Sequence, residues 1–172
     1  ASPSYLASKV AYKRIYKYNP NIKMIVLLRD PGDRAYSAWS MYRARYQENR
    51  NWFFDDWVSF IGGEPDQYIK RSDEEVNSFE MFVKNEITNL SYLHFESIEA
   101  PILPQGLYEE HLSKFLTLFK RDQLLVVESS FFREHTSEVL DSIESFLSIR
   151  KFDWDRINLS PIFEGGYADV LD

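Results

Sequence analysis

The chain has no cysteine among its 172 residues, which excludes a disulfide scaffold, a cysteine-ligated zinc site and a thiol nucleophile. Its three histidines, at positions 94, 111 and 135, are scattered and show no metal-ligand spacing. The longest apolar runs, such as residues 24–28, fall far short of the roughly 20 residues that span a bilayer. No signal-like segment opens the sequence. We therefore expect chemistry without a metal and no membrane segment in this chain.

Acidic residues are scarce in one part of the sequence only. Residues 1–50 carry ten Lys and Arg against three Asp and Glu, whereas the remainder carries ten against twenty-four, and the net charge is -7. A cationic stretch of this kind attracts phosphate-bearing small molecules or polyanions. Lys9, Lys13, Arg14 and Lys17 fall at helical spacing, so a solvated basic helix is the alternative explanation for these four. Nucleic-acid binding is not expected of an acidic chain that has no nucleic-acid motif.

The apolar residues predict one compact domain over residues 1–172, since 44% of the chain is hydrophobic and 16% aromatic. Two short apolar runs predict strands at residues 23–29 and 124–127, and the first has the unbroken apolar character of a central strand covered on both faces. Periodic apolar residues predict helices, which cover residues 4–18, 30–47, 53–61, 73–93, 108–119 and 139–147. This alternation indicates an α/β fold, a parallel sheet flanked by helices.

Two strands are too few for such a fold, because sheets usually contain about 4–6. We therefore expect part of the sheet to lie outside this sequence. The weakest pattern falls on residues 48–105, which Gly62, Gly63 and the prolines interrupt. This region is predicted to be a variable helical insertion that faces the substrate.

The stretch LLRDPGDRAYS combines a strand end with the start of a helix. Arg29 ends the apolar run, and Asp30 and Pro31 are typical of an N-cap and a first helical residue. A helix N-terminus at the carboxyl end of a parallel strand favours an anion, and a guanidinium can bind phosphate with two hydrogen bonds. The geometry predicts a phosphate site formed by Arg29 and Ser37. The alternatives are an ion pair of Arg29 with an adjacent aspartate and a solvent-facing Ser37.

This stretch resembles the signature of the sulfotransferase superfamily, and most closely its bacterial and carbohydrate-type branch, which includes the heparan sulfotransferases. Further segments resemble the family's lead-in, its later helix and strand, and its terminal helix: SPSYL, NPNIKMIVLLR, GLYEEHLSKFLTLFKRDQLLVVESSFF and VLDSIESFL. The resemblance implies a P-loop-NTPase-like fold and the co-substrate 3'-phosphoadenosine-5'-phosphosulfate (PAPS), used without a metal. It places Arg29 and Ser37 at the 3'-phosphate of PAPS.

The resemblance also implies a role at the nucleotide for Arg34, for which an ion pair within the helix is the alternative. Tyr108 matches a common family aromatic, for which core packing is the alternative. Nothing in the chain resembles the family's phosphosulfate-binding loop, so that loop, the missing N-terminal strands and the catalytic residues are expected upstream of Ala1. His111 is one of several possible general bases, but we expect it to be a surface residue.

The reaction implied is transfer of a sulfuryl group from PAPS to a hydroxyl or amine of an acceptor, expected to be a glycan, with adenosine 3',5'-bisphosphate as the product. The alternative is a catalytically inert domain that binds a nucleotide or a polyanion. The absence of cysteine and of an anchor favours a cytoplasmic location.

Overall fold

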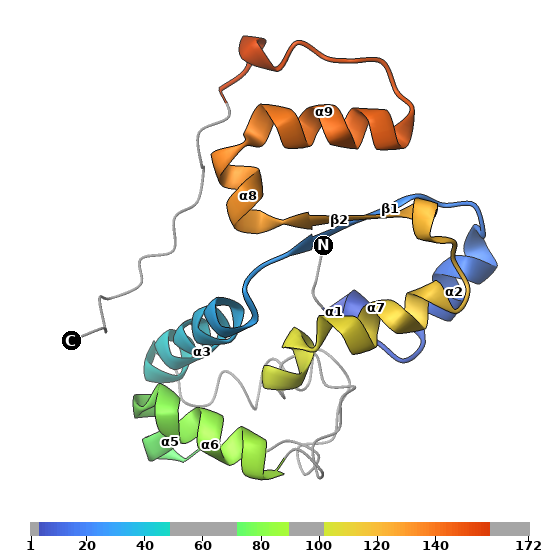
Figure 1. Cartoon of the computed structure of the whole chain (residues 1–172). Helices are drawn as coiled ribbons and strands as arrows, with labels where there is room; N and C mark the ends of the chain where they lie inside the picture. Colours follow the sequence, from blue (N-terminus) through green and yellow to red (C-terminus); the bar gives the residue numbers. More distant parts are fainter. Residues whose placement is uncertain (1–3, 49–71, 90–101, 159–172) are drawn as a thin grey trace. The chain divides into compact units, whose positions relative to one another are not determined.

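The computed structural model of the chain describes residues 4–48, 72–89 and 102–158 (Figure 1). The chain divides into two compact units, each of which combines segments that are distant in the sequence. The first unit consists of Ala1–Lys9 and Pro31–His111. The second consists of Val10–Asp30 and Leu112–Asp172.

The first unit is helical in its described part. Its elements are α1 (Ser4–Ala7), α3 (Pro31–Glu48), α5 (Asp73–Asn77), α6 (Phe79–Asn89), the 3-10 helix η4 (Leu103–Gly106) and the start of α7 (Tyr108–Leu116). The core consists of Ala35, Trp39, Phe82 and Ile102, so α3, α6 and the residue before η4 meet in one cluster. The Trp39 indole N–H donates to the Glu75 carbonyl at 2.8 Å, which ties α5 to α3. Burial of this cluster holds η4 against α3 and α6.

The second unit contains both strands. Its elements are α2 (Ala11–Tyr18), β1 (Met24–Leu28), the end of α7, η5 (Arg121–Gln123), β2 (Leu124–Glu128), α8 (Ser129–Glu134), α9 (Thr136–Leu147) and η6 (Trp154–Arg156). The strands pair in parallel, with Met24 opposite Leu124 and Leu28 opposite Glu128. In Figure 1 they lie side by side, and α8 and α9 follow β2. The predicted α/β fold with a parallel sheet flanked by helices is therefore confirmed.

Two of the predicted helices are divided in the structure. The helix predicted over residues 4–18 is divided into α1 and α2, and Val10 has a non-helical backbone with φ -124°. Ser8 and Val10 both have low helix propensity, which explains a break at this point. The helix predicted over residues 73–93 is divided at Ser78, whose backbone is extended. Residues 90–93, like the helix predicted at 53–61, lie outside the described residues.

The first strand is also less covered than predicted. Burial alternates along β1, and the side chains of Ile25 and Leu27 are 43% and 55% exposed. The prediction that both faces of this strand are covered is therefore wrong for the described structure. The physical reason is that the described sheet has two strands, and the helices with the most extensive contacts to it, α8 and α9, lie against β2. No helix among the described residues is both long and apolar enough to cross a membrane.

Candidate functional site

The junction between β1 and α3 has the predicted arrangement of strand, turn and helix. Arg29 directly follows β1, and its side chain is partly buried. Helix α3 begins at Pro31, with Asp33 in its first turn. The first four N–H groups of a helix have no partner within that helix, and together with the helix dipole they favour an anion. The structure thus provides a helix N-terminus two residues after Arg29.

Ser37 lies in the second turn of α3, and its side chain is partly buried rather than fully solvated. It belongs to the first compact unit, whereas Arg29 belongs to the second. Their joint contact with one phosphate therefore stays a prediction. Arg29 and Ser37 each have at least one further interaction within the protein.

Arg34 joins α3 to the segment around η4. Its guanidinium donates to the Ile102 carbonyl and, at 3.3 Å, to the Gln105 side-chain oxygen. Its side chain also forms a hydrogen bond with Tyr108. Burial lowers the pKa of Arg34 below its ordinary value, and the nearby Tyr108 and Glu86 partly offset that effect. These contacts give Arg34 a positioning role within the first unit, and its predicted contact with the nucleotide stays a prediction.

A close approach of η4 to α3 accompanies this network. A Cβ added to Gly106 would lie 3.1 Å from the Cβ of Pro31 and 3.8 Å from a guanidinium nitrogen of Arg34. A side chain at position 106 would therefore require Pro31 to shift by a few tenths of an ångström. The Gly-x-Tyr sequence at positions 106–108 thus has a structural explanation: glycine permits the approach and tyrosine bonds the arginine.

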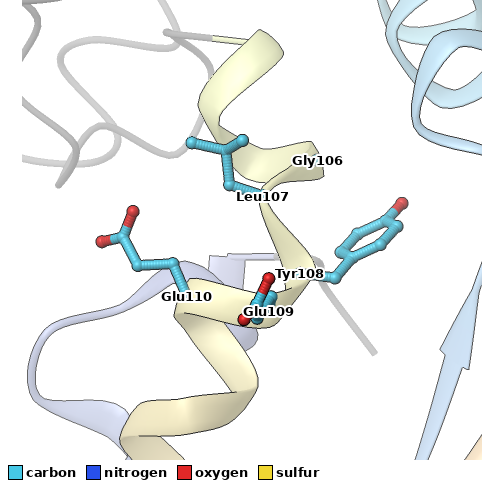
Figure 2. A pocket seen from close by; sticks show the side chains of 5 residues that line it. All are labelled: Gly106, Leu107, Tyr108, Glu109 and Glu110. Atoms are coloured by element: carbon cyan, nitrogen blue, oxygen red, sulfur yellow. The ribbon is translucent and has the colours of Figure 1, made fainter.

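An open pocket of about 600 Å³ lies at the junction of η4 and α7. Figure 2 shows the side chains that line it, from Gly106 to Glu110, with the Tyr108 ring directed away from the Glu110 carboxylate. Leu107 is half exposed in this pocket. Tyr108 combines partial burial with its bond to Arg34, so core packing alone does not describe its environment.

Two buried polar side chains, Glu86 and His111, support the segment around η4. The sequence patterns did not single out Glu86. Glu86 on α6 is fully buried, and its two carboxylate oxygens accept from the backbone N–H groups of Ile102 at 2.9 Å and Leu103 at 2.7 Å. It fixes the start of η4, the segment that supplies the hydrogen-bond acceptors of the Arg34 guanidinium. A lone glutamate in a helical stretch resembles a solvent-facing residue, and only its apolar neighbours on α6 could have signalled burial.

The expectation that His111 is a surface residue is wrong. Its side chain is 1% exposed, and its Nε2 lies 2.8 Å from the Pro104 carbonyl oxygen. Because a carbonyl can only accept, Nε2 carries the proton of this bond. Nδ1 is buried and has no hydrogen-bond partner among the described residues. His111 therefore connects α7 to η4, and the described contacts assign it no proton transfer.

The sequence also predicts chemistry without a metal and several possible general bases. Among residues 4–48, 72–89 and 102–158, no group of three or more His, Asp or Glu side chains is placed to hold a metal ion. The greater part of the substrate-facing insertion predicted at 48–105, including His94, lies outside the described residues. Its described part consists of α5, α6 and the start of η4.

Comparisons with known proteins agree with the resemblance seen in the sequence. A family model described as "Sulfotransferase domain" matches residues 2–158. The chain is 25% identical over 151 residues to the human bifunctional heparan sulfate N-deacetylase/N-sulfotransferase 2, covering 88% of this chain and 14% of that protein. It is 28% identical over 148 residues to the human type 3 protein of the same name, covering 86% and 14%. The chain thus spans about one seventh of the length of these relatives.

Proposed function

Since this chain belongs to the sulfotransferase domain family, we propose that it carries the 3'-phosphate-binding part of a site that transfers a sulfuryl group from PAPS to a glycan. The match of the family model to residues 2–158 is the observation that supports this proposal most directly. The junction of β1 and α3 supports it further, because an arginine at a strand end and a helix N-terminus both favour a phosphate.

In the proposed reaction, an amine or hydroxyl of the acceptor attacks the sulfur atom of PAPS. The bond between sulfur and the bridging oxygen of the 5'-phosphate breaks, and adenosine 3',5'-bisphosphate leaves. The proton of the acceptor passes to a general base. Negative charge grows on the leaving oxygen, so cationic donors fixed around it would lower the barrier, as in phosphoryl transfer.

Arg29 and Ser37 act at a distance from the bond that breaks. A guanidinium and a hydroxyl on the 3'-phosphate would hold the donor in register without stabilising the transition state directly. The N–H groups at the start of α3 would contribute to the same anion. Arg34, through Ile102, Gln105 and Tyr108, would keep the first turns of α3 in place.

The names of the relatives suggest the acceptor class. Those proteins are called heparan sulfate N-sulfotransferases, so we propose an amino sugar in an acidic polysaccharide as the acceptor. Labelled PAPS offered with a panel of N-desulfated polysaccharides and small hydroxyl compounds would test this. Transfer to the polysaccharides alone is expected. Nucleotide binding without transfer to any acceptor would support the catalytically inert alternative instead.

Arg29→Ala should weaken binding of adenosine 3',5'-bisphosphate by about 2–4 kcal/mol, because it removes a charge-assisted contact with two hydrogen bonds. Titration calorimetry on the intact protein would measure the loss. Ser37→Ala should cost less, about 1 kcal/mol, since it removes one hydroxyl donor. Arg133→Ala, an exposed arginine on α8, is the matched control. Unchanged affinity in Arg29→Ala would remove Arg29 from the site.

A further inference from the structure

One face of helix α2 carries only positive charge. At 100° per residue, Lys13, Lys17 and Arg14 lie within an arc of about 100° on the helix surface. All three side chains are exposed, and α2 contains no acidic residue. The opposite face packs on the second unit, with Tyr12 against Phe115 and Tyr16 against Phe119. The packed face fixes the helix, so the three cations point to solvent together.

These cations have no carboxylate partner within 4.0 Å among the residues that the structure describes. Other described lysines and arginines do: Lys84 pairs with Glu80 at 2.6 Å, Lys151 with Asp141 at 3.3 Å and Arg156 with Asp153 at 4.0 Å. The Lys13 ammonium lies 5.6 Å from the centre of the Tyr12 ring, a contact that leaves its charge uncompensated. The basic face of α2 thus concentrates positive charge on a chain whose net charge is -7.

The surroundings of α2 extend this potential. The Gln123 side chain donates to the carbonyls of Pro20 at 2.8 Å and Ile22 at 3.1 Å, which holds η5 beside the loop that follows α2. Lys120 and Arg121 come from this segment, against one carboxylate, Asp122. This loop and η5 precede the amino ends of β1 and β2, whereas Arg29 follows the carboxyl end of β1. The surroundings of α2 and Arg29 therefore lie at opposite ends of the strands.

We propose that the basic face of α2, formed by Lys13, Arg14 and Lys17, binds a sulfated polysaccharide chain at a surface separate from the nucleotide site. The proposal rests on the proposed function, in which the acceptor is an acidic polysaccharide and the product is the same polysaccharide with an additional sulfate group. A narrow flexible chain can lie along one helix face, whereas a stiff nucleic-acid duplex would also approach the acidic remainder of the protein. Contact here would hold a long acceptor on the protein between successive transfers.

The test is a binding measurement that needs no transfer. Affinity of the intact protein for a heparin dodecasaccharide would be measured at several salt concentrations, without PAPS. The triple variant Lys13→Glu, Arg14→Glu and Lys17→Glu should bind about 10- to 100-fold more weakly, and the slope of log affinity against log salt should fall by about two to three. The matched control, Lys84→Glu, Arg133→Glu and Arg156→Glu, makes the same change in net charge at dispersed positions. It should keep most of the affinity.

Four outcomes overturn the proposal: equal losses in the two triple variants, no binding of heparin by the wild-type protein, binding of duplex DNA as tight as that of heparin, and stronger binding to phosphatidylserine vesicles. Circular dichroism on both triple variants would confirm that α2 remains folded. A protein that binds heparin through α2 but transfers no sulfate would disprove the proposed function and leave this inference intact. A protein that transfers sulfate but shows no loss in the α2 variant would do the reverse.

Discussion

At the scale of single residues, Glu128 shows how one carboxylate can organise a chain turn. It ends β2 and accepts three hydrogen bonds: from the Ser130 hydroxyl, from the Ser130 N–H at 2.9 Å and from the Phe131 N–H at 2.7 Å. These bonds, with the Ser130 hydroxyl contributing most, lower the pKa of Glu128 to about 2. The side chain thereby caps α8, a helix that begins directly after the strand.

The pKa of Glu128 predicts an acid-dependent loss of stability. Because its pKa in the folded state lies below the ordinary value of a glutamate, the ionised side chain stabilises the fold above about pH 4.5, and this contribution disappears as the pH falls toward 2. Between about pH 5 and pH 3, the free energy of unfolding should decrease less in Glu128→Gln than in the wild type. Urea denaturation at the two pH values would measure it. Glu134→Gln, on the same helix, should retain the wild-type drop, and an equal drop in Glu128→Gln would disprove the capping role.

At the scale of elements, Glu86 predicts how firmly η4 is attached to α6. Glu86→Ala would leave the N–H groups of Ile102 and Leu103 without an acceptor in a buried site, which should lower the free energy of unfolding by about 2–4 kcal/mol. Glu86→Gln keeps one acceptor oxygen and should cost roughly half as much. Urea denaturation would give both values. Glu80→Gln, an exposed change on the same helix, is the control, and similar stability of all three variants would mean that water replaces the carboxylate.

The elements that the sequence predicted well are those with a strong local signal. The two apolar runs became β1 and β2, and the Asp-Pro-Gly-Asp turn correctly marked the start of α3, which ends at Glu48. Helix α8 was not predicted, because its six residues give no apolar period and its N-cap is a glutamate at the end of the strand instead of the usual Ser, Thr, Asp or Asn. The breaks after Ala7 and at Ser78 were also missed, because a helical period continues across both.

The candidate site could be predicted only where it depends on sequential neighbours. Arg29, the turn and α3 follow one another in the chain, so their order was predictable. The contacts of Arg34 with Ile102 and Tyr108 join positions about 70 residues apart, and no single-sequence pattern encodes such a pair. The same applies to Glu86 and His111, whose polar side chains are buried because their partners are backbone groups of another segment.

At the scale of the whole molecule, the two compact units are interleaved along the chain. The backbone passes from one unit to the other after Lys9, after Asp30 and after His111. The parallel pairing of Met24 with Leu124 therefore closes a chain loop that contains nearly the whole first unit. Closing a loop of this length costs entropy, which the burial of Leu124, Val127 and Val139 helps to offset.

This interleaving predicts which pieces of the chain can form the sheet. A fragment of residues 112–172 contains β2 but not its partner, and an isolated strand is not stable in water, so its amides at Leu124–Glu128 should exchange rapidly. Joining residues 10–30 to residues 112–172 through a Gly/Ser linker of about 20 residues restores β1 and should restore slow exchange at those amides. Hydrogen exchange followed by NMR would compare both proteins with the intact chain. Rapid exchange in the joined protein would mean that the sheet depends on the first unit, and protection in the short fragment would mean that β2 is held by α8 and α9 alone.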